Sequence, residues 1–281
     1  MTFATRVTFT LLALSLVTPT HAADLAARTY VKAPTLDPAY DWTGFYAGLH
    51  AGYGWGDANV NSDLVSSNFD ALIDLGVLPA SVAARRDGFI GGGQIGYNQT
   101  YGAWVLGLET DLSYADFKGG STTLTSSAPA PGLNLAVTET ASAKTDVFGT
   151  LRARVGFIPV DRLLLFGTGG LAYGHTSFTT SINSDVNGTP TCAPAPGGFC
   201  GAGQITKWSA GWTLGGGFEY ALGSNWSAKA EYLFYDLGTI SHTFADPAQP
   251  AQLLGTSVRL NGNIVRAGIN YKFGGPVVAR Y

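Results

Sequence analysis

The stretch GFIGGGQIG contains Gly91, Gly93 and Gly96 at the spacing of the glycine fingerprint that binds a dinucleotide pyrophosphate. Such a fingerprint must follow a strand and open a helix within a βαβ unit. Here the glycines run directly into GYNQTYG and a second strand-like stretch, which leaves no room for that helix. The glycines therefore predict a tightly curved strand and not a nucleotide-binding site.

Glu109 and Asp111 are a second candidate for chemistry, because alternate residues of a strand lie on one face. Two adjacent carboxylates could act as a general acid and base. Arg152 and Arg154 are expected at matching height on the next strand, where their charges would keep both carboxylates ionised. We interpret the group as an ion-pair network and predict no catalytic residues.

The histidines and cysteines offer further possibilities. His50 could serve a hydrolase, but no Ser or Asp is clearly placed beside it, so a hydrogen-bonded structural role is favoured. His175 and His242 could ligate haem iron, although nothing in the sequence fixes their separation. Cys192 and Cys200 lie in CAPAPGGFC and predict a local disulfide in an exported chain. No resident cofactor or metal is expected, with haem as the alternative.

The composition indicates which elements must position these residues. Of 281 residues only 12% are charged, whereas 12% are aromatic and 38 are Gly, which favours β-structure over helices. The formal net charge of −3 argues against a nucleic-acid partner. Eight stretches alternate with period two between an apolar face and a polar or glycine-rich face. They begin with WTGFYAGLHAGYGW and end with residues 258–274.

The connections between these stretches alternate strictly between short and long. Residues 100–102, 158–162 and 223–225 are tight turns, whereas roughly residues 57–86, 117–143, 178–204 and 239–257 are long and polar. This alternation is typical of an outer-membrane barrel with short periplasmic turns and long extracellular loops. The sequence predicts an all-β, eight-stranded, antiparallel up-and-down transmembrane β-barrel with four long extracellular loops.

The barrel assigns an inside and an outside to the patterned residues. Eight strands enclose an interior that side chains can fill, and charges inside it must be paired or hydrated. The predicted lumen network comprises Glu109, Asp111, Arg152, Arg154, Glu219, Lys229, Glu231, Arg266 and Lys272. Aromatic rings near strand ends predict girdles at both membrane interfaces. The girdle residues are Trp42, Trp55, Trp104, Trp208, Trp212, Trp226, Tyr271 and Phe273.

Residues 1–22 predict a secretory signal peptide, with Arg6, an apolar stretch from 7 to 17, and cleavage after Ala22. Residues 23–41 are expected to form an extended periplasmic segment, and residues 42–281 the barrel. Within the first long loop, Phe69, Leu72 and Ile73 have helical spacing. They predict either a short helix packed on the rim or an exposed contact for a partner.

The strand motifs also carry a family resemblance. GFIGGGQIGYN, VLGLETDLSY, FGTLRARVGF, GWTLGGGFEYAL, WSAKAEYLFYDLG and VRAGINYKFG resemble, in order, the strands of small alphaproteobacterial outer-membrane barrels of the RopB type. That family is distantly related to the OmpA transmembrane barrel and to opacity-type adhesins. The resemblance implies an outer-membrane location, roles in envelope integrity and host contact, haemin binding in some members, and no agreed catalytic residues.

The leading functional hypothesis is a structural and surface-interaction barrel whose lumen is closed by ion pairs. A small-solute porin, a haem-binding surface protein and, third, a barrel enzyme acting on lipid or peptide are the alternatives. The expected partners are outer-membrane lipid and lipopolysaccharide, the outer-membrane assembly machinery and host surface ligands.

Overall fold

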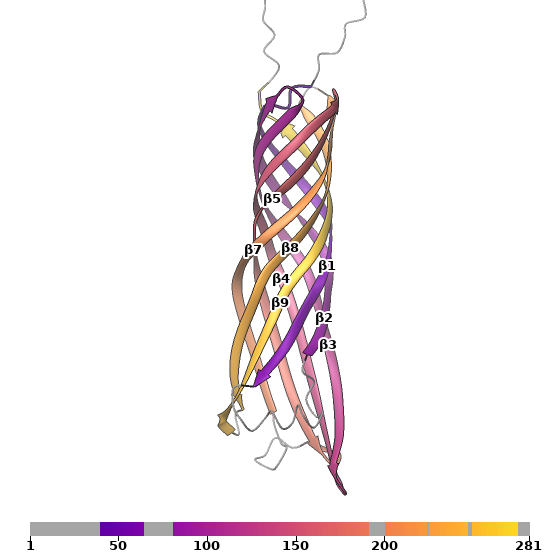
Figure 1. Ribbon diagram of the computed structural model, residues 1–281, viewed down its shortest axis with the longest axis vertical. Coiled ribbons are helices and arrows are strands. Elements are labelled where there is room, and N and C mark those ends of the chain that lie inside the picture. Colours follow the sequence, from indigo (N-terminus) through magenta and orange to yellow (C-terminus); the bar gives the residue numbers. More distant parts are fainter. Residues whose placement is uncertain (1–39, 65–80, 191–199, 224, 247–248, 275–281) are drawn as a thin grey trace, which may run out of the picture. The chain divides into compact units, whose positions relative to one another are not determined.

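The computed structural model describes residues 40–64, 81–190, 200–223, 225–246 and 249–274, and nearly all of them are in β-strands (Figure 1). The strands are β1 (Gly44–Leu64), β2 (Ser81–Tyr101), β3 (Trp104–Ala130), β4 (Leu133–Val160), β5 (Leu163–Val186), β6 (Thr189–Pro190), β7 (Cys200–Gly223), β8 (Trp226–Asp246) and β9 (Gln249–Lys272). Among these residues no helix is long and apolar enough to cross a membrane.

Eight of the strands close into one ring, as the sequence predicts. Each long strand pairs antiparallel with its neighbours in the chain, β1 pairs with β9, and β4 pairs with β5. The two-residue β6 folds back on the end of β5 and lies outside the ring order. Antiparallel neighbours joined by hairpins make this an up-and-down barrel.

The predicted long loops are wrong in extent, because the strands continue through most of them. In residues 117–143, β3 and β4 pair almost to the turn at Pro131 and Gly132, and this hairpin projects beyond its neighbours in Figure 1. Its polar residues alternate with Leu135 and Val137, which are buried. Polarity suggested loops, but a water-exposed strand also needs one polar face. Residues 65–80, with the predicted helix, lie outside the described residues.

Near the long hairpins, the strands are no longer paired all the way around the ring, which separates into two groups of strands. In the described residues, the pairing of β2 with β3 ends at Asp87 and Lys118, and that of β7 with β8 ends at Trp212 and Asp236. Bulges occur near this level in β3, β4 and β8. The bulge in β8 contains Gly238 at a φ of 77°, a conformation that suits glycine.

The polarity of the wall inverts at the same level. Toward the short turns, β9 exposes Val265 and Ile269 and buries Arg266; toward the long hairpins, β9 exposes Arg259 and buries Leu260. A wall facing lipid needs an apolar outside, whereas a wall facing water needs an apolar inside. We call the two parts the lower section, next to the short turns and drawn at the top of Figure 1, and the upper section, next to the long hairpins and drawn at its bottom.

Candidate functional site

The interior of the lower section contains a layer of buried charges centred on Glu109. Glu109 of β3 lies directly opposite Arg152 of β4 in the register, and its carboxylate accepts a short hydrogen bond from that guanidinium. Lys229 Nζ of β8 lies 2.9 Å and 3.0 Å from the two Glu109 oxygens. Tyr46 donates its hydroxyl to Glu109 Oε2 at 2.6 Å. Glu109 is therefore fully engaged and not available as a general acid.

Arg152 connects three carboxylates from two sides of the ring. Besides Glu109, its Nη1 lies 2.9 Å from Glu231 Oε2 and its Nη2 lies 3.2 Å from Asp111 Oδ2. Its Nε donates to Thr150 Oγ1 at 2.9 Å. Charge-assisted hydrogen bonds of this kind are about twice as strong as neutral ones.

Arg266 extends the layer to the opposite wall. Its Nε lies 2.6 Å from Glu231 Oε1 and its Nη2 lies 2.8 Å from Asp111 Oδ2. Its Nη1 also lies 3.1 Å from Nε2 of His50. Asp111 thus has two guanidinium partners, so the carboxylate pair predicted by spacing acts as the acceptor side of an ion-pair network.

The structure corrects one prediction about His50. A serine is placed beside it: Ser113 Oγ lies 2.8 Å from His50 Nε2. The pair has the separation of a nucleophile and its base. However, the same Nε2 faces Arg266, His50 Nδ1 has no hydrogen-bond partner to orient the ring, and both residues are buried. The arrangement lacks the orienting acid and the substrate access of a catalytic unit.

Arg154 and Glu219 form a second part of the layer, nearer the short turns. Arg154 Nη2 makes a short contact with Glu219 Oε2, and its guanidinium lies 3.9 Å from the centre of the Phe166 ring. Ser227 and Asn270 donate to Glu219 Oε1 at 2.5 Å and 2.8 Å. Lys229, opposite Glu219 in the register, bonds instead to Glu109 and Gln94.

The layer is neutral by its own composition. We define the lumen network by its members Glu109, Asp111, Glu219, Glu231, Arg152, Arg154, Lys229 and Arg266. Lys272, which the sequence placed in it, lies outside: its Nζ donates to the backbone oxygen of Asp41 and lies 3.7 Å from that side chain. Lys272 is at the last strand residue, so it reaches the mouth of the barrel and not the layer.

The lower mouth is filled by the chain that precedes β1. Trp42 is buried with Val105 and Leu164, and Tyr40 packs against this cluster. The prediction that Trp42 belongs to the outer girdle is therefore wrong: the chain turns inward before β1. Burial, followed by the negative charge of Glu219, raises the pKa of Tyr40 to about 12, so its hydroxyl remains neutral.

An apolar core fills the barrel on the other side of the network. It includes Phe117 and Phe148, whose rings each contact the ring of Tyr235, with Phe148 and Tyr235 centred 5.0 Å apart. The lumen network therefore lies between two apolar clusters. This placement keeps water away from the charges and makes each pair more dependent on its partner.

Arg86 is a functional candidate that the sequence prediction missed. It is 2% exposed, yet it lies in the apolar upper section and forms no ion pair with any described residue. The alternation that places Gln94 inside also places Arg86 inside, but residues 57–86 were assigned to a loop. The period-two pattern, extended by a few residues, would have found it.

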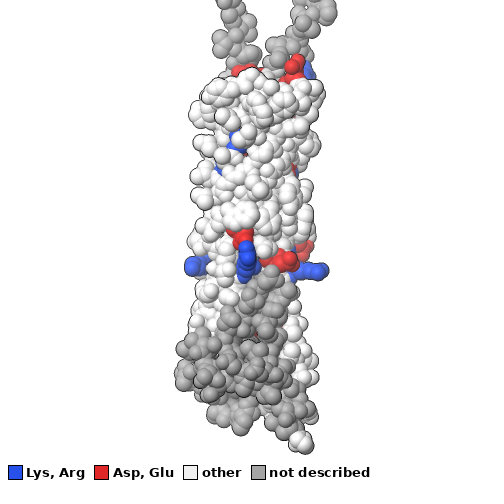
Figure 2. All heavy atoms as spheres, in the orientation of Figure 1, with Lys and Arg blue, Asp and Glu red and all other residues white. Residues whose placement is uncertain are grey.

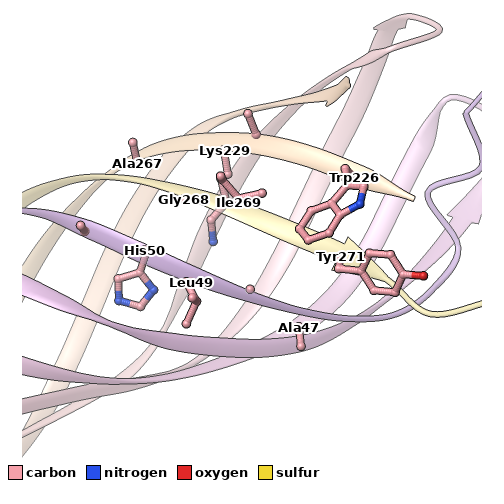
Figure 3. Close-up of a pocket in the computed structure, with 12 residues that line it drawn as sticks. Ala47, Leu49, His50, Trp226, Lys229, Ala267, Gly268, Ile269 and Tyr271 are labelled. Carbon is pink, nitrogen blue, oxygen red and sulfur yellow. The ribbon is translucent and has the colours of Figure 1, made fainter. Parts of the chain in front are cut away.

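The outer wall of the lower section has the aromatic rings expected of a membrane protein. The seven other girdle residues are exposed: Trp55, Trp104, Trp208, Trp212, Trp226, Tyr271 and Phe273. Between them the wall of β1, β8 and β9 is hollowed into an open apolar groove of about 810 Å³ (Figure 3). Its floor is made of small residues such as Ala47 and Ala267, with Trp226 and Tyr271 toward one end.

A belt of charged residues follows the aromatic girdle on the side of the long hairpins, and Figure 2 shows it as a band across the wall, below the uncharged part. Register places Asp57 opposite Arg85, Asp87 opposite Lys118, and Lys118 opposite Lys144. We call these residues, with Asp116 and Arg259, the charge belt. Charged side chains begin where the lipid-facing band ends, as expected at a membrane interface.

The remaining candidates are not brought together. His175 lies on the outer side of β5, where its Nδ1 is 2.7 Å from Asp146 Oδ1. His242 lies on β8 opposite Thr256 of β9, and β5 and β8 are not neighbours in the ring. Within the described part of the chain, no cluster of three His, Cys, Asp or Glu could hold a metal. Cys192 of the predicted disulfide lies outside the described residues, so the bond to Cys200 stays a prediction.

These observations define an integral outer-membrane β-barrel. The model of the outer membrane protein beta-barrel domain family matches residues 9–273, and the chain belongs to this family. The predicted fold class and outer-membrane location are confirmed.

Named relatives place the chain within the family more closely. It is 37% identical over 259 residues to the 31 kDa outer-membrane immunogenic protein of Brucella melitensis, covering 91% of this chain and 94% of the relative. It is 26% identical to the 25 kDa outer-membrane immunogenic protein of Brucella abortus, covering 86% and 85%. It is also 26% identical to the 22 kDa outer membrane protein of Rhizobium leguminosarum, covering 71% and 66%. The resemblance to small alphaproteobacterial barrels is confirmed.

Proposed function

We propose that this protein is a closed outer-membrane barrel that supports the integrity of the envelope and presents its upper section as a contact surface. The observation that carries the closed state is the lumen network, in which buried residues from β3, β4, β7, β8 and β9 contact one another across the interior. Apolar clusters lie on both sides of it. A hydrated path would have to separate pairs such as Arg152 and Glu231.

The contact surface follows from the polarity of the upper section. The outward positions of β5 there include Ser177, Thr179 and Ser181, whereas Phe178 and Ile182 face inward. Such a wall is stable in water and extends beyond the charge belt. The names of two relatives describe them as immunogenic, which agrees with a surface-exposed section in those proteins. Host surface ligands are the partners we propose for it.

Conductance measurements distinguish the closed barrel from a small-solute porin. Purified, folded protein in planar bilayers is expected to give no stable current. Arg152→Ala, which separates the network, is expected to give intermittent openings, and Leu151→Ala on the outer wall serves as its control. A stable, reproducible current through the wild-type barrel, abolished by substitution of Arg152, would establish the porin function and end this proposal.

The two proposed roles can be separated by shortening one hairpin. Because Lys118 and Lys144 are opposite in the register, the β3–β4 hairpin can be closed with a two-residue turn after Gly119 and before Ala143. In a strain lacking the native protein, the shortened barrel should restore detergent resistance but not adhesion to host cells. Loss of both properties in a folded, surface-exposed barrel would show that the sections do not act separately.

A further inference from the structure

Arg86 is a buried cation without a buried counter-charge. Its neighbour Arg85 points outward into the charge belt, whereas Arg86 points inward and is 2% exposed. No described carboxylate forms an ion pair with it. A charge removed from water is costly unless it is paired, so this position calls for a specific compensating group.

The lumen network does not supply that compensation. It contains four carboxylates and four cationic side chains, each engaged within the layer. Glu139 is another buried acid of the upper section. It lies six residues along β4 from Thr145, the residue to which Arg86 bonds, or about 20 Å at the usual rise of a strand. The charge of Arg86 is therefore not balanced at contact distance.

The donors of Arg86 are only partly used. Nη1 donates to Thr145 Oγ1 at 2.9 Å, and Nη2 lies 3.5 Å from the Tyr235 hydroxyl, which is long for a hydrogen bond. Nε has no hydrogen-bond partner. Thr145 also contacts the hydroxyl of Thr176 at 3.0 Å. A guanidinium donor without a partner and two nearby hydroxyl groups provide the donors that an anion needs.

We propose that Arg86, Thr145 and Tyr235 bind a small inorganic anion, of the size of chloride, inside the upper section. Close packing limits the size of the anion. The Phe117 ring lies against Gly54, where even a Cβ atom would come within 2.4 Å of it, and the Tyr235 hydroxyl lies against Gly262 in the same way, at 2.6 Å. The site goes beyond the structural role proposed above, because it gives the interior of the upper section a specific ligand.

Chloride binding can be measured directly on the folded barrel in detergent by the broadening of the chloride NMR signal. The wild type should show saturable broadening that bromide displaces and gluconate, at equal ionic strength, does not. Arg86→Met should abolish the saturable component. Arg85→Met removes the same charge from the adjacent outward position and should leave it unchanged.

Tyr235→Phe provides a second, milder test that keeps Arg86 in place. Losing one donor to an anion should weaken chloride binding by about tenfold or more. If Arg86→Met does not fold, this variant decides the question. Broadening that does not saturate, that is equal in both arginine variants, or that is unaffected by Tyr235→Phe would overturn the proposal.

Discussion

The lower and upper sections of this barrel fill the same ring in opposite ways. In the lower section the outside is apolar and the interior holds a neutral set of paired charges; in the upper section the outside is polar and the interior holds an apolar core together with buried polar groups such as Thr180 and Arg86. The strands pass through both sections, so the strand pattern alone does not decide which face is polar. Which face is polar depends on whether lipid or water surrounds the wall, and the charge belt marks the boundary between the two.

The largest expected effect comes from removing a cation of the lumen network. Arg152→Met leaves Glu109, Asp111 and Glu231 with an uncompensated buried charge, and we expect a loss of about 4 kcal/mol in the free energy of unfolding. The same change at Arg86 should alter it by less than about 1 kcal/mol, because no carboxylate loses its partner there. Denaturant unfolding in lipid vesicles measures both. Equal losses would contradict the distinction between the sections.

A cavity in the upper core should have a somewhat smaller effect. Phe148→Ala removes a fully buried ring that packs on Tyr235, and we expect a loss of about 3 kcal/mol. Thr122→Ala on the exposed wall of the same section is the control and should stay within about 0.5 kcal/mol. An unchanged midpoint for Phe148→Ala would mean that the upper section does not contribute a cooperative core.

The hydroxyl of Tyr46 tests the network with a smaller change. Tyr46→Phe removes one hydrogen bond to the Glu109 carboxylate but keeps the ring and every charge. We expect a loss of about 2 kcal/mol, the usual magnitude for a hydrogen bond to a charged group. Because Arg154 Nη1 also approaches this hydroxyl at 3.5 Å, a gain in stability would show that the contact is not favourable.

The smallest effect is expected at alkaline pH in the lower mouth. Folding raises the pKa of Tyr40 from its ordinary value of 10.0 to about 12, mainly through burial. A raised pKa means that its stabilising contribution is complete below about pH 10 and is lost as the pH rises through about 12. The wild type should therefore lose more stability than Tyr40→Phe across this range. Parallel curves would place Tyr40 outside the folded mouth.

The sequence predicted the strands of the lower section because two independent signals agree there: the period-two alternation and the aromatic residues near the strand ends. Counting from Trp104 and Phe157 places Glu109 and Arg152 at one height, and the register pairs them. Pairings between distant strands, such as Arg152 with Glu231, depend on the curvature of the ring and cannot be read from local spacing. Trp42 was assigned to the girdle because the sequence does not distinguish an aromatic ring at the membrane interface from one that fills the mouth of the barrel.

The upper section was missed because its sequence was interpreted by average polarity. On β4, Leu135, Val137, Ala141 and Ala143 are spaced by multiples of two, a pattern that indicates a strand with an apolar inner face. On β5, Phe178 and Ile182 share the inner face with Thr180. The bulges near the charge belt also change which positions face inward: β4 buries Arg152 below and Ala143 above. In the sequence, this change in which alternate residues face inward is marked only by glycines such as Gly238.

The inversion of polarity is tested most directly by spin labels along the outer face of β9. After replacement of both cysteines, a label is placed in turn at Ser257, Arg259, Asn261, Asn263, Val265, Ala267 and Ile269. In lipid vesicles, dissolved oxygen should relax the labels at Val265, Ala267 and Ile269. A water-soluble nickel chelate should relax the labels from Ser257 to Asn263. Lipid contact continuing to Ser257, or water contact at Ala267, would contradict the inversion of polarity along β9.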